Sequence, residues 1–311
     1  MKNYLDESGN IHLSYYLEAA DILNIKYEVL VKSLLARFEH QNKHWFIINT
    51  VTPLVNSPGK TIAYRKNLTN IVLAKAGIPI PKQRVLKNVE EAIGFFNENK
   101  SIVIKPEQGI GGKGVSILPG SFEEVKSCFE NSKGYTDSVI IGEEYISGEN
   151  YRLLTLGEKV IGALRRTKPK ITGDGGSTVE KIIKTQNPKI PLDAETVKEL
   201  KRQGLTLQSI PTKGQVVYAR QNTNLTTGGE TEECHKEVHP YYEELAVKAI
   251  KAIGIKLGGV DLITEDITKP AKCAINEINY NPGLRIHYQA NKGDKVKVAI
   301  PIMEYIRDNE I

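Results

Sequence analysis

Three residues with side-chain oxygens lie near the C-terminal end of the chain, on two apolar runs that have the pattern of paired strands. Asp261 lies in the first run, 258–263, and Glu277 and Asn279 lie in and just after the second run, 273–278. Because side chains alternate between the faces of a strand, Glu277 and Asn279 point to one face. Magnesium takes oxygen ligands, typically one or two carboxylates, and leaves its other positions to water and substrate phosphates. The stretch therefore suggests a nucleotide–metal site; the alternative is that each acidic residue is solvated or caps a turn.

A glycine-rich segment, 105–114, joins two further apolar runs. Glycine lets the backbone approach a ligand closely, and consecutive amides can form a concavity that binds an anion. Lys105 ends the first of these runs, where its ammonium must find an anion or extend to solvent. The segment matches neither a P-loop, which ends in Gly-Lys-Ser/Thr, nor a dinucleotide fingerprint, which opens a helix. We expect phosphate as its ligand, with a plain hairpin turn as the alternative. Its glycines are Gly109, Gly111, Gly112 and Gly114.

An acidic segment and two arginines could contact the rest of an anionic substrate. The segment 143–152 follows an apolar run, and its carboxylates could accept hydrogen bonds from an adenine amine or from ribose hydroxyls. Arg220 ends a predicted strand and Arg285 lies in a later loop; the planar fork of a guanidinium suits phosphate or carboxylate. The alternatives are solvated acids and surface ion pairs. His239 and His287 have no metal-binding partner at a useful spacing, and we interpret them first as packing or surface histidines.

Composition excludes several classes of protein. Of the 311 residues, 40% are hydrophobic and 25% are charged, and no apolar run is long enough to cross a membrane. Three scattered cysteines without a CxxC spacing argue against a disulfide framework and against a zinc site. The net charge of +5 is modest and has no basic block, so nucleic-acid binding has no support. The N-terminus is polar, unlike a signal peptide, and we expect a cytoplasmic protein.

Helical and strand periodicities alternate along the chain and indicate a mixed α+β protein. The first 55 residues hold a helix between strands, a small α/β lobe, and Pro58 with Gly59 is expected to break the chain after it. From about Pro81 a compact α+β lobe begins. The segment 167–214 is polar with two helices, and it is either a flap over a site or a passive surface excursion. A long helix over 240–253 precedes the hairpin of the proposed metal site.

Taken in order, these motifs resemble the ATP-grasp carboxylate–amine ligases, most of all the ATP-grasp portion of cyanophycin synthetases and of bifunctional glutathione synthetases. The segments that carry the resemblance are YRKNLTNIVLAKAGIPIP, VIKPEQGIGGKGV, EEYISGENYRLL, YARQNTNLTTGG with the later HP, GGVDLITEDITKP and INEINYNPGLRIH. The resemblance implies an α+β ATP-grasp fold in which two α+β lobes clamp ATP after a short α/β lobe. The implied ranges are 1–60 for the short N-terminal lobe, 61–145 for the small ATP-grasp lobe, and 146–311 for the large lobe.

The resemblance also implies roles for individual residues. Those implied to hold Mg²⁺ between the phosphates are Asp261, Glu277 and Asn279. Those implied to act on the reacting groups are Arg220 and Asn224, which would face the phosphoryl group and the intermediate, and Arg285, which would face the acceptor or its carboxylate. Those implied to contact ATP, through its phosphates, adenine or ribose, are Lys66, Lys105, Gly109, Gly111, Gly112, Gly114, Glu143, Glu144, Ile146, Glu149 and Asn150.

Two departures from the family pattern bear on these roles. Gly148 is followed by Glu149 and then Asn150, so the ribose contact stays open between the last two. D-alanine–D-alanine ligases carry an arginine two positions before the first metal carboxylate, where this chain has Gly259. That difference disfavours the cell-wall dipeptide reaction and leaves Arg220 as the charge stabiliser.

The resemblance implies an enzyme that uses ATP to join a small-molecule carboxylate to an amine through an acyl phosphate. The carboxylate is expected to belong to an amino acid or a small peptide, and a homodimer is expected by analogy. Two alternatives stay open: an ATP-grasp enzyme that modifies side chains of a ribosomal peptide, and a nucleotide-binding regulator without turnover.

Overall fold

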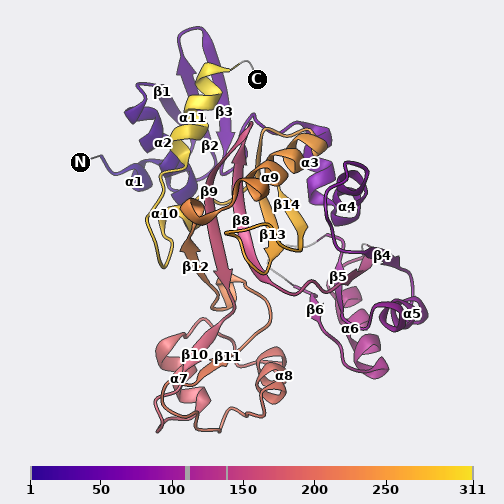
Figure 1. Cartoon of the computed structure of the whole chain (residues 1–311). Helices are drawn as coiled ribbons and strands as arrows, with labels where there is room; N and C mark the ends of the chain where they lie inside the picture. Colours follow the sequence, from indigo (N-terminus) through magenta and orange to yellow (C-terminus); the bar gives the residue numbers. More distant parts are fainter. Residues whose placement is uncertain (1, 109–112, 138, 310–311) are drawn as a thin grey trace. The chain divides into compact units, whose positions relative to one another are not determined.

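The computed structural model describes residues 2–108, 113–137 and 139–309, which form two compact units (Figure 1). Unit 1 consists of Met1–Pro81, Ile146–Arg165 and Glu232–Ile311. Unit 2 consists of Lys82–Tyr145 and Arg166–Thr231. The ranges expected from the sequence follow chain order, whereas the compact units are interleaved, because the N-terminal lobe packs onto strands that are distant in sequence.

A five-stranded sheet forms the centre of unit 1. Its strand order is β12–β9–β8–β13–β14. The bounds are β12 Glu230–Glu233, β9 Lys159–Thr167, β8 Glu149–Leu156, β13 Leu257–Thr264 and β14 Cys273–Asn279. Strand β13 pairs antiparallel with both β8 and β14. The two strands predicted for the metal site are therefore neighbours, and β8 lies on the other side of the first.

Each face of this sheet has its own core, because neighbouring strand residues point to opposite sides. Leu153 packs in the core under α9 (Pro240–Ile253), with α3 (Ser57–Tyr64) and α4 (Lys66–Lys75) against the same face. Leu154 packs on the other face, in the core that includes α2 (Ile11–Ile22) and α11 (Ala299–Asp308). Helix α9 has the bounds that its apolar periodicity predicted, and Gly254 ends it with a left-handed φ of 77°.

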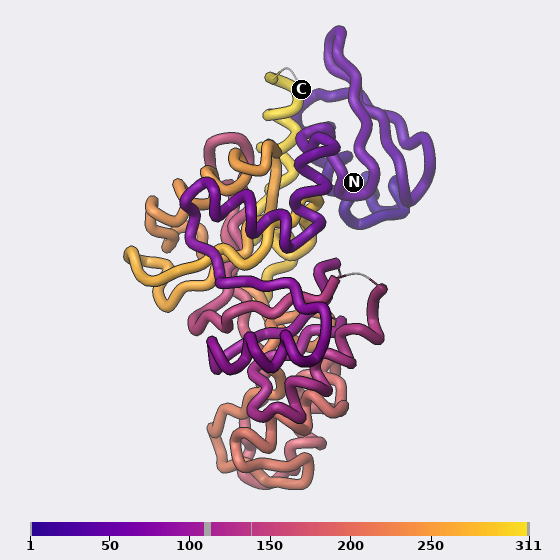
Figure 2. Tube along the Cα trace, turned by 90° about the vertical axis from the view of Figure 1, so that its right-hand side faces the viewer, coloured from indigo at the N-terminus to yellow at the C-terminus, as the bar shows by residue number. Residues whose placement is uncertain are grey.

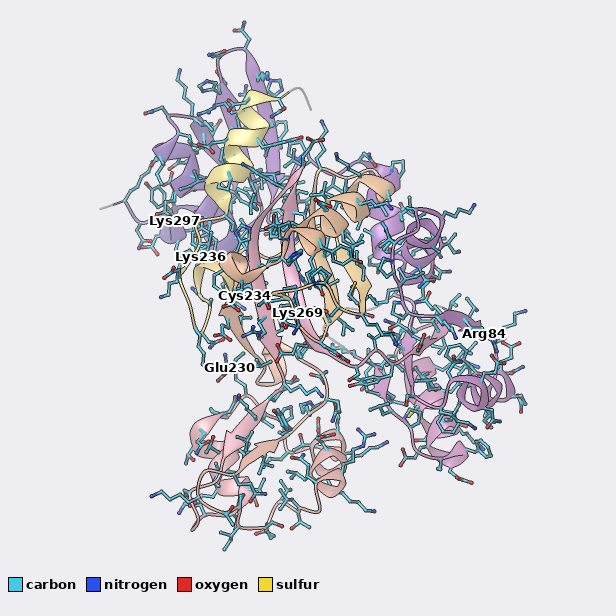
Figure 3. The ribbon with its side chains drawn as sticks, in the orientation of Figure 1. Arg84, Glu230, Cys234, Lys236, Lys269 and Lys297 are labelled. Carbon is cyan, nitrogen blue, oxygen red and sulfur yellow. The ribbon has the colours of Figure 1, made fainter. Side chains whose placement is uncertain are left out.

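The N-terminal part of unit 1 contains a small antiparallel sheet and two helices. Its elements are α1 Tyr4–Ser8, α2, β1 Lys26–Val31, β2 Leu35–His40 and β3 Lys43–Ile48, with strand order β1–β2–β3. Strand β2 was missed in the sequence because its LARFEH run mixes charged and apolar residues. The C-terminal helix α11, drawn in yellow, packs on α2 of the indigo N-terminal part (Figure 2). Lys297, labelled in Figure 3, bonds Glu18 of α2 at 2.8 Å just before α11 begins.

The prediction of a chain break at Pro58 and Gly59 is wrong. Both residues lie in the first turn of α3, where proline is tolerated because that position has no intrahelical hydrogen bond to lose. Asn56 caps the helix by accepting a hydrogen bond from the Gly59 amide at 2.7 Å. Gly59 also lies close to Ile255, whose methyl carbon would be 2.4 Å from an added Cβ. This glycine therefore permits close packing rather than ending the element.

Unit 2 contains two small sheets with their helices. The first sheet has the order β4–β7–β5–β6 and packs with α5 and α6, around Phe95 and Phe129. The second pairs β10 with β11 and packs with α7 and α8 around Ile182 and Val217. The bounds are β4 Gln83–Leu86, α5 Val89–Asn99, β5 Ile102–Pro106, β6 Ser116–Ile117, α6 Phe122–Gly134, β7 Ile140–Glu144, β10 Lys170–Thr172, α7 Val179–Gln186, α8 Ala194–Arg202 and β11 Val216–Tyr218.

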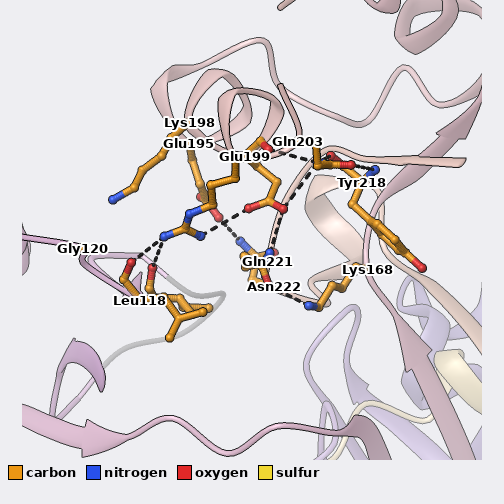
Figure 4. A network of polar contacts seen from close by, with 12 residues as sticks. Leu118, Gly120, Lys168, Glu195, Lys198, Glu199, Gln203, Tyr218, Gln221 and Asn222 are labelled. Carbon is orange, nitrogen blue, oxygen red and sulfur yellow. Dashed lines mark hydrogen bonds and ion pairs between the residues drawn. The ribbon is translucent and has the colours of Figure 1, made fainter. Parts of the chain in front are cut away.

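Polar contacts join the two halves of unit 2 (Figure 4). Arg202 at the end of α8 donates to the carbonyl oxygens of Ile117 and Leu118, which follow the glycine-rich segment. Lys198 of the same helix bonds Glu124 of α6 at 2.5 Å. The segment 167–214 is therefore fixed to the lobe that carries the glycines, as a packed part of the unit with its own core.

Candidate functional site

The three predicted metal ligands come together on β13 and β14 of unit 1. Asp261 pairs across the strands with Glu277, and Gly259 pairs with Asn279. Asp261 is 5% exposed, whereas the side chain of Glu277 is 30% exposed. Residues that are directly opposite on an antiparallel pair have Cβ atoms about 4.5–5.5 Å apart, so both carboxylates can reach one ion. The hairpin read from the sequence thus places these side chains together.

Arg152 lies against Asp261 and was not identified from the sequence. It pairs with Asp261 across β8 and β13, and its guanidinium donates to both carboxylate oxygens, Nη2 to Oδ2 at 2.9 Å. Burial by itself would lower the pKa of Arg152, but the charge and hydrogen bonds of Asp261 and the charge of Glu277 raise it overall. Buried, bidentate pairs of this kind fix the orientation of a carboxylate. Arg152 is therefore a positioning residue for Asp261.

Gly259 makes room for this arginine. A Cβ added at Gly259 would lie 2.8 Å from Cδ of Arg152, closer than carbon atoms approach in proteins. D-alanine–D-alanine ligases carry an arginine at the position of Gly259. In this chain, the side chain of Arg152 from the neighbouring strand β8 lies against that position. Arg152 ends the acidic segment 143–152, which the sequence had singled out. Its place beside Asp261 could not be predicted, because the strands that pair there are more than a hundred residues apart in the chain.

Lys66 is the second cation beside the predicted metal ligands. It is the first residue of α4, and its ammonium lies 3.7 Å from Oε1 of Glu277. The Lys66 side chain is 11% exposed. Arg152 thus lies beside Asp261, and Lys66 lies beside Glu277.

These residues fit a magnesium ion. Two carboxylates and the amide oxygen of Asn279 are hard oxygen donors, which match the preference of Mg²⁺ for one or two carboxylates plus other oxygens. The amide nitrogen of Asn279 is buried without a hydrogen-bond partner among the described residues. No group of three or more histidine, cysteine or acidic side chains suited to a metal occurs in the described part of the chain. The carboxylate and amide oxygens of these three residues favour an oxygen-seeking ion such as Mg²⁺.

Two predicted nucleotide contacts form a buried ion pair in unit 2. Nζ of Lys105 on β5 bonds Oε1 of Glu143 on β7 at 2.7 Å, and both side chains are at most 6% exposed. Gln83 donates to the other oxygen of Glu143 at 3.0 Å. Glu144 is half-buried, and its amide bonds the carbonyl of Lys82 at 2.8 Å. The carboxylate of Glu143 therefore orients Lys105.

Part of the glycine loop lies outside the described residues. Gly109, Gly111 and Gly112 belong to that part. Gly114 is described, with a φ of 70°, a left-handed conformation that favours glycine, and its carbonyl accepts a hydrogen bond from Ser132 at 2.6 Å. The strand expected after the loop is short, because β6 spans only Ser116–Ile117.

The two candidates for the ribose contact differ in their surroundings. Glu149 bonds Arg165 at 3.0 Å and accepts from the hydroxyl of Tyr151 at 2.8 Å. Asn150 alternates with Glu149 along β8 and therefore shares the sheet face of Arg152 and Asp261. This placement favours Asn150 over Glu149. Ile146, at the start of the second segment of unit 1, is half-buried.

Arg220 lies in unit 2, buried against the first turn of α8. It bonds Asp193 at 2.7 Å, Thr196 at 3.2 Å, and a carboxylate oxygen of Glu195. Burial raises the pKa of the Glu195 carboxyl even though Arg220 opposes that shift. Asn224 precedes the short 3₁₀ helix Leu225–Thr227, and its backbone N–H donates to Oδ1 of Asn222. The guanidinium expected at the phosphoryl group is thus engaged by acidic residues of its own unit.

Two residues after β14 differ in exposure. Arg285 begins the short helix α10, Arg285–Tyr288, and is exposed. His287 is 1% exposed, and burial lowers its pKa. Its Nδ1 lies 3.6 Å from a carboxylate oxygen of Glu233, and an added Cβ at Gly162 would lie 3.0 Å from Nδ1. The interpretation of His287 as a packing residue agrees with this burial.

Two family models match successive parts of the chain. Residues 70–211 match the ATP-grasp domain of prokaryotic glutathione synthetase, and residues 213–306 match the RimK-like ATP-grasp domain. The chain belongs to the ATP-grasp carboxylate–amine ligase family. Ligases of this family use ATP and Mg²⁺, and the side-chain oxygens predicted to bind the metal lie on β13 and β14.

Several relatives match most of this chain but are much longer. The glutathione biosynthesis bifunctional protein of Clostridium perfringens is 34% identical over 79% of this chain and 34% of its own length. A cyanophycin synthetase from Nostoc is 34% identical over 84% of this chain and 31% of its own length. The crystal structure of a bifunctional glutathione synthetase from Pasteurella multocida has a TM-score of 0.68 and 27% identity, over 96% of this chain and 44% of that chain. This ATP-grasp chain therefore spans about a third of the curated relatives.

These comparisons confirm the α+β ATP-grasp fold expected from the sequence. Among the helices described, none is long and apolar enough to span a membrane.

Proposed function

We propose that this ATP-grasp chain is a ligase that uses ATP and Mg²⁺ to form an amide bond between a carboxylate and an amine. The observation that carries the proposal is the pairing of Asp261 with Glu277, with Asn279 on the same strand end, in a sheet of this family's fold. Such a set would hold Mg²⁺, which takes its remaining ligands from water and nucleotide phosphates. We further propose that the carboxylate belongs to an amino acid or a small peptide, as the names of the relatives suggest for those proteins.

The reaction proceeds in two balanced steps. An oxygen of the substrate carboxylate attacks the γ-phosphorus of ATP, the bond to the β-phosphate oxygen breaks, and ADP leaves an acyl phosphate. The amine nitrogen then attacks the acyl carbon, the bond from that carbon to the phosphate oxygen breaks, and phosphate departs as the nitrogen loses a proton. Magnesium, when bound, would supply charge neutralisation at the phosphates.

The side chains of this chain act mainly by position and charge. Asp261, oriented by Arg152, and the more exposed Glu277 would hold Mg²⁺ through their carboxylate oxygens. Lys66, close to Glu277, and Lys105, oriented by Glu143, are the cations proposed for the phosphates. Preorganised charges of this kind act on the transition state because they need no rearrangement as the phosphoryl group moves.

A coupled assay of ADP release tests the proposal. The purified chain is given MgATP with pairs drawn from the common amino acids and short peptides, and each partner is also supplied alone. We expect release of ADP only when a carboxylate and an amine are both present, together with an amide product detected by mass spectrometry. Equal release of ADP with either partner alone, or none with any pair, would contradict the ligase function. A regulator without turnover would give the second result.

The homodimer and the cytoplasmic location stay predictions. Light scattering of the purified chain over a tenfold range of concentration measures the first, and a mass equal to one chain at every concentration would count against it. Fractionation of the producing cell tests the second.

A further inference from the structure

The segment that follows Asn279 is packed against the N-terminal part of unit 1. The hydroxyl of Thr50 donates to the carbonyl of Asn281 at 3.3 Å. The rings of Tyr15 on α2 and Tyr288 on α10 are stacked, with centroids 3.8 Å apart and planes inclined by 13°. The loop from Asn279 to Arg285 thus packs against Thr50 and helix α2 of the same unit.

Gly283 brings a histidine of α2 close to this loop. An added Cβ at Gly283 would lie 3.2 Å from Cε1 and 3.7 Å from Nε2 of His12. The imidazole of His12 also meets the ring of Tyr15 edge-on, with centroids 6.5 Å apart. His12 and Tyr15 therefore stand side by side on the helix, both turned toward the segment that carries Arg285.

Both side chains keep polar atoms without a hydrogen-bond partner among the described residues. Nδ1 of His12 and the hydroxyl of Tyr15 are buried, and Tyr15 as a whole is 8% exposed. Buried polar groups in folded proteins are nearly always paired, because an unpaired one costs free energy. Packing alone does not explain the hydroxyl, since phenylalanine would stack equally well on Tyr288.

Arg285 adds a positive charge at the same place. It is exposed, and no hydrogen bond or ion pair of its guanidinium occurs in the described part of the chain. Burial lowers the pKa of His12, and the charge of Arg285 lowers it further; burial raises the pKa of Tyr15, and Arg285 opposes that rise. Arg285 lies in the chain between Gly283, which is beside His12, and Tyr288, which stacks on Tyr15, so its charge belongs to the same segment. One cation beside two buried polar groups is suited to an anion with planar oxygens.

We propose that His12 and Tyr15 of the N-terminal lobe join Arg285 to form a subsite that binds a carboxylate group of the amino-acid substrate. The inference rests on the proposed ligase function for the identity of the ligand, and it adds the N-terminal lobe to the residues that select the substrate. The hydroxyl of Tyr15 donates to one carboxylate oxygen, the guanidinium of Arg285 binds the other, and the imidazole of His12 lies between them.

Ligand-observed NMR of the full chain with MgADP tests the subsite directly. The probes are glycine, L-aspartate and L-glutamate, with glycinamide as the analogue that lacks the carboxylate. We expect binding of at least one of the three acids and none of glycinamide. Tyr15→Phe and Arg285→Gln should each weaken binding of that acid by about 10-fold, the loss typical of one hydrogen bond to a charged group. Tyr218→Phe and Arg37→Gln, which change exposed residues elsewhere, should leave it unchanged.

A second measurement separates binding from folding. Because the hydroxyl of Tyr15 has no described partner, Tyr15→Phe should unfold at the same temperature as the wild type or a higher one. Affinity for MgADP should not change in either variant. Wild-type affinity for the acid in Tyr15→Phe or in Arg285→Gln, or no binding of any acid by the wild type, would overturn the subsite.

The outcome is distinguishable from that of the ligase proposal. Loss of acid binding in these variants, with no ADP release by the wild type from any substrate pair, supports the subsite and contradicts the ligase function. Unchanged acid binding in the variants, with ADP release by the wild type from a substrate pair, contradicts the subsite and supports the ligase function. Where turnover is found, the Michaelis constant that rises in Tyr15→Phe identifies whether the bound carboxylate belongs to the activated substrate or to the amine substrate.

Discussion

Each unit contains a lysine close to a glutamate, and the two pairs differ in closeness and burial. Lys105 and Glu143 in unit 2 are 2.7 Å apart, and both are at most 6% exposed. Lys66 and Glu277 in unit 1 are 3.7 Å apart, and the glutamate is 30% exposed. A tight buried pair is costly to separate, whereas a loose pair open to solvent exchanges partners readily. We infer that Glu143 orients its lysine permanently, while Glu277 can leave Lys66 for a metal ion.

Removing the buried carboxylate should have the largest effect. Glu143→Gln removes the carboxylate charge that pairs with the buried Lys105, and breaking a buried pair in this way costs about 3–5 kcal/mol. Urea unfolding measures the loss. Glu130→Gln, an exposed change on α6, is the control and should be within about 0.5 kcal/mol of the wild type. A similar small change in Glu143→Gln would show that the two pairs do not differ as proposed.

Removing the half-buried carboxylate of Glu277 should affect turnover rather than stability. In Glu277→Gln we expect turnover to fall by about two to three orders of magnitude, the loss typical of one preorganised charge group. Its free energy of unfolding should change by about 1 kcal/mol or less. Steady-state kinetics and urea unfolding on one preparation give both values. The nearby exposed Glu265→Gln serves as control. Wild-type turnover in Glu277→Gln would remove this residue from the mechanism.

A methyl group added at position 259 tests whether the packing of Arg152 requires a glycine there. In Gly259→Ala the added methyl meets Cδ of Arg152 at 2.8 Å, and overpacking of this kind costs about 1–3 kcal/mol. Gly94→Ala on α5, where an added Cβ meets nothing within 4 Å, should instead be neutral or stabilising by up to about 1 kcal/mol. Thermal unfolding compares the two. Equal stabilities would mean that Arg152 moves aside without cost.

Removing the lysine of the Lys66–Glu277 pair should change the affinities for a metal ion and for ATP in opposite directions. Lys66→Met removes the cation that competes for Glu277, so Mn²⁺, used as a spectroscopic substitute, should bind the nucleotide-free chain about 5-fold more tightly, a change of about 1 kcal/mol. ATP should bind more weakly, because its phosphates lose a cation. Electron paramagnetic resonance and calorimetry measure the two affinities, with Lys75→Met at the exposed end of α4 as control. Changes of the same sign would contradict the exchange of partners.

The sequence was most informative where structure depends on local pattern. The apolar periodicity of α9 and the alternation of β13 and β14 are local, and the structure contains these elements at the expected places. Asp261 and Glu277 could be paired because one hairpin joins their strands. Arg152 could not, because its neighbour on β13 is more than a hundred residues away and the register is set by the whole sheet.

Tertiary contacts also changed the meaning of residues whose type suggested chemistry. Arg220 was predicted from its position at a strand end, but carboxylates from the first turn of α8 surround it. His12 and Tyr15 carried no motif, because their role depends on the loop after Asn279 packing on α2. The role of such a side chain depends on its neighbours in the folded structure, and the spacing of residues along the sequence does not reveal those neighbours.

The transfer of oxygen from the carboxylate to phosphate tests the central claim most directly. A substrate pair found by ADP release is prepared with ¹⁸O in both carboxylate oxygens, and the released phosphate is analysed by mass spectrometry. Because the carboxylate attacks the γ-phosphorus and the phosphate later departs with that oxygen, we predict one ¹⁸O atom in each phosphate for each amide formed. Phosphate free of ¹⁸O alongside labelled amide would contradict an acyl phosphate, and with it the ligase mechanism proposed for this ATP-grasp chain.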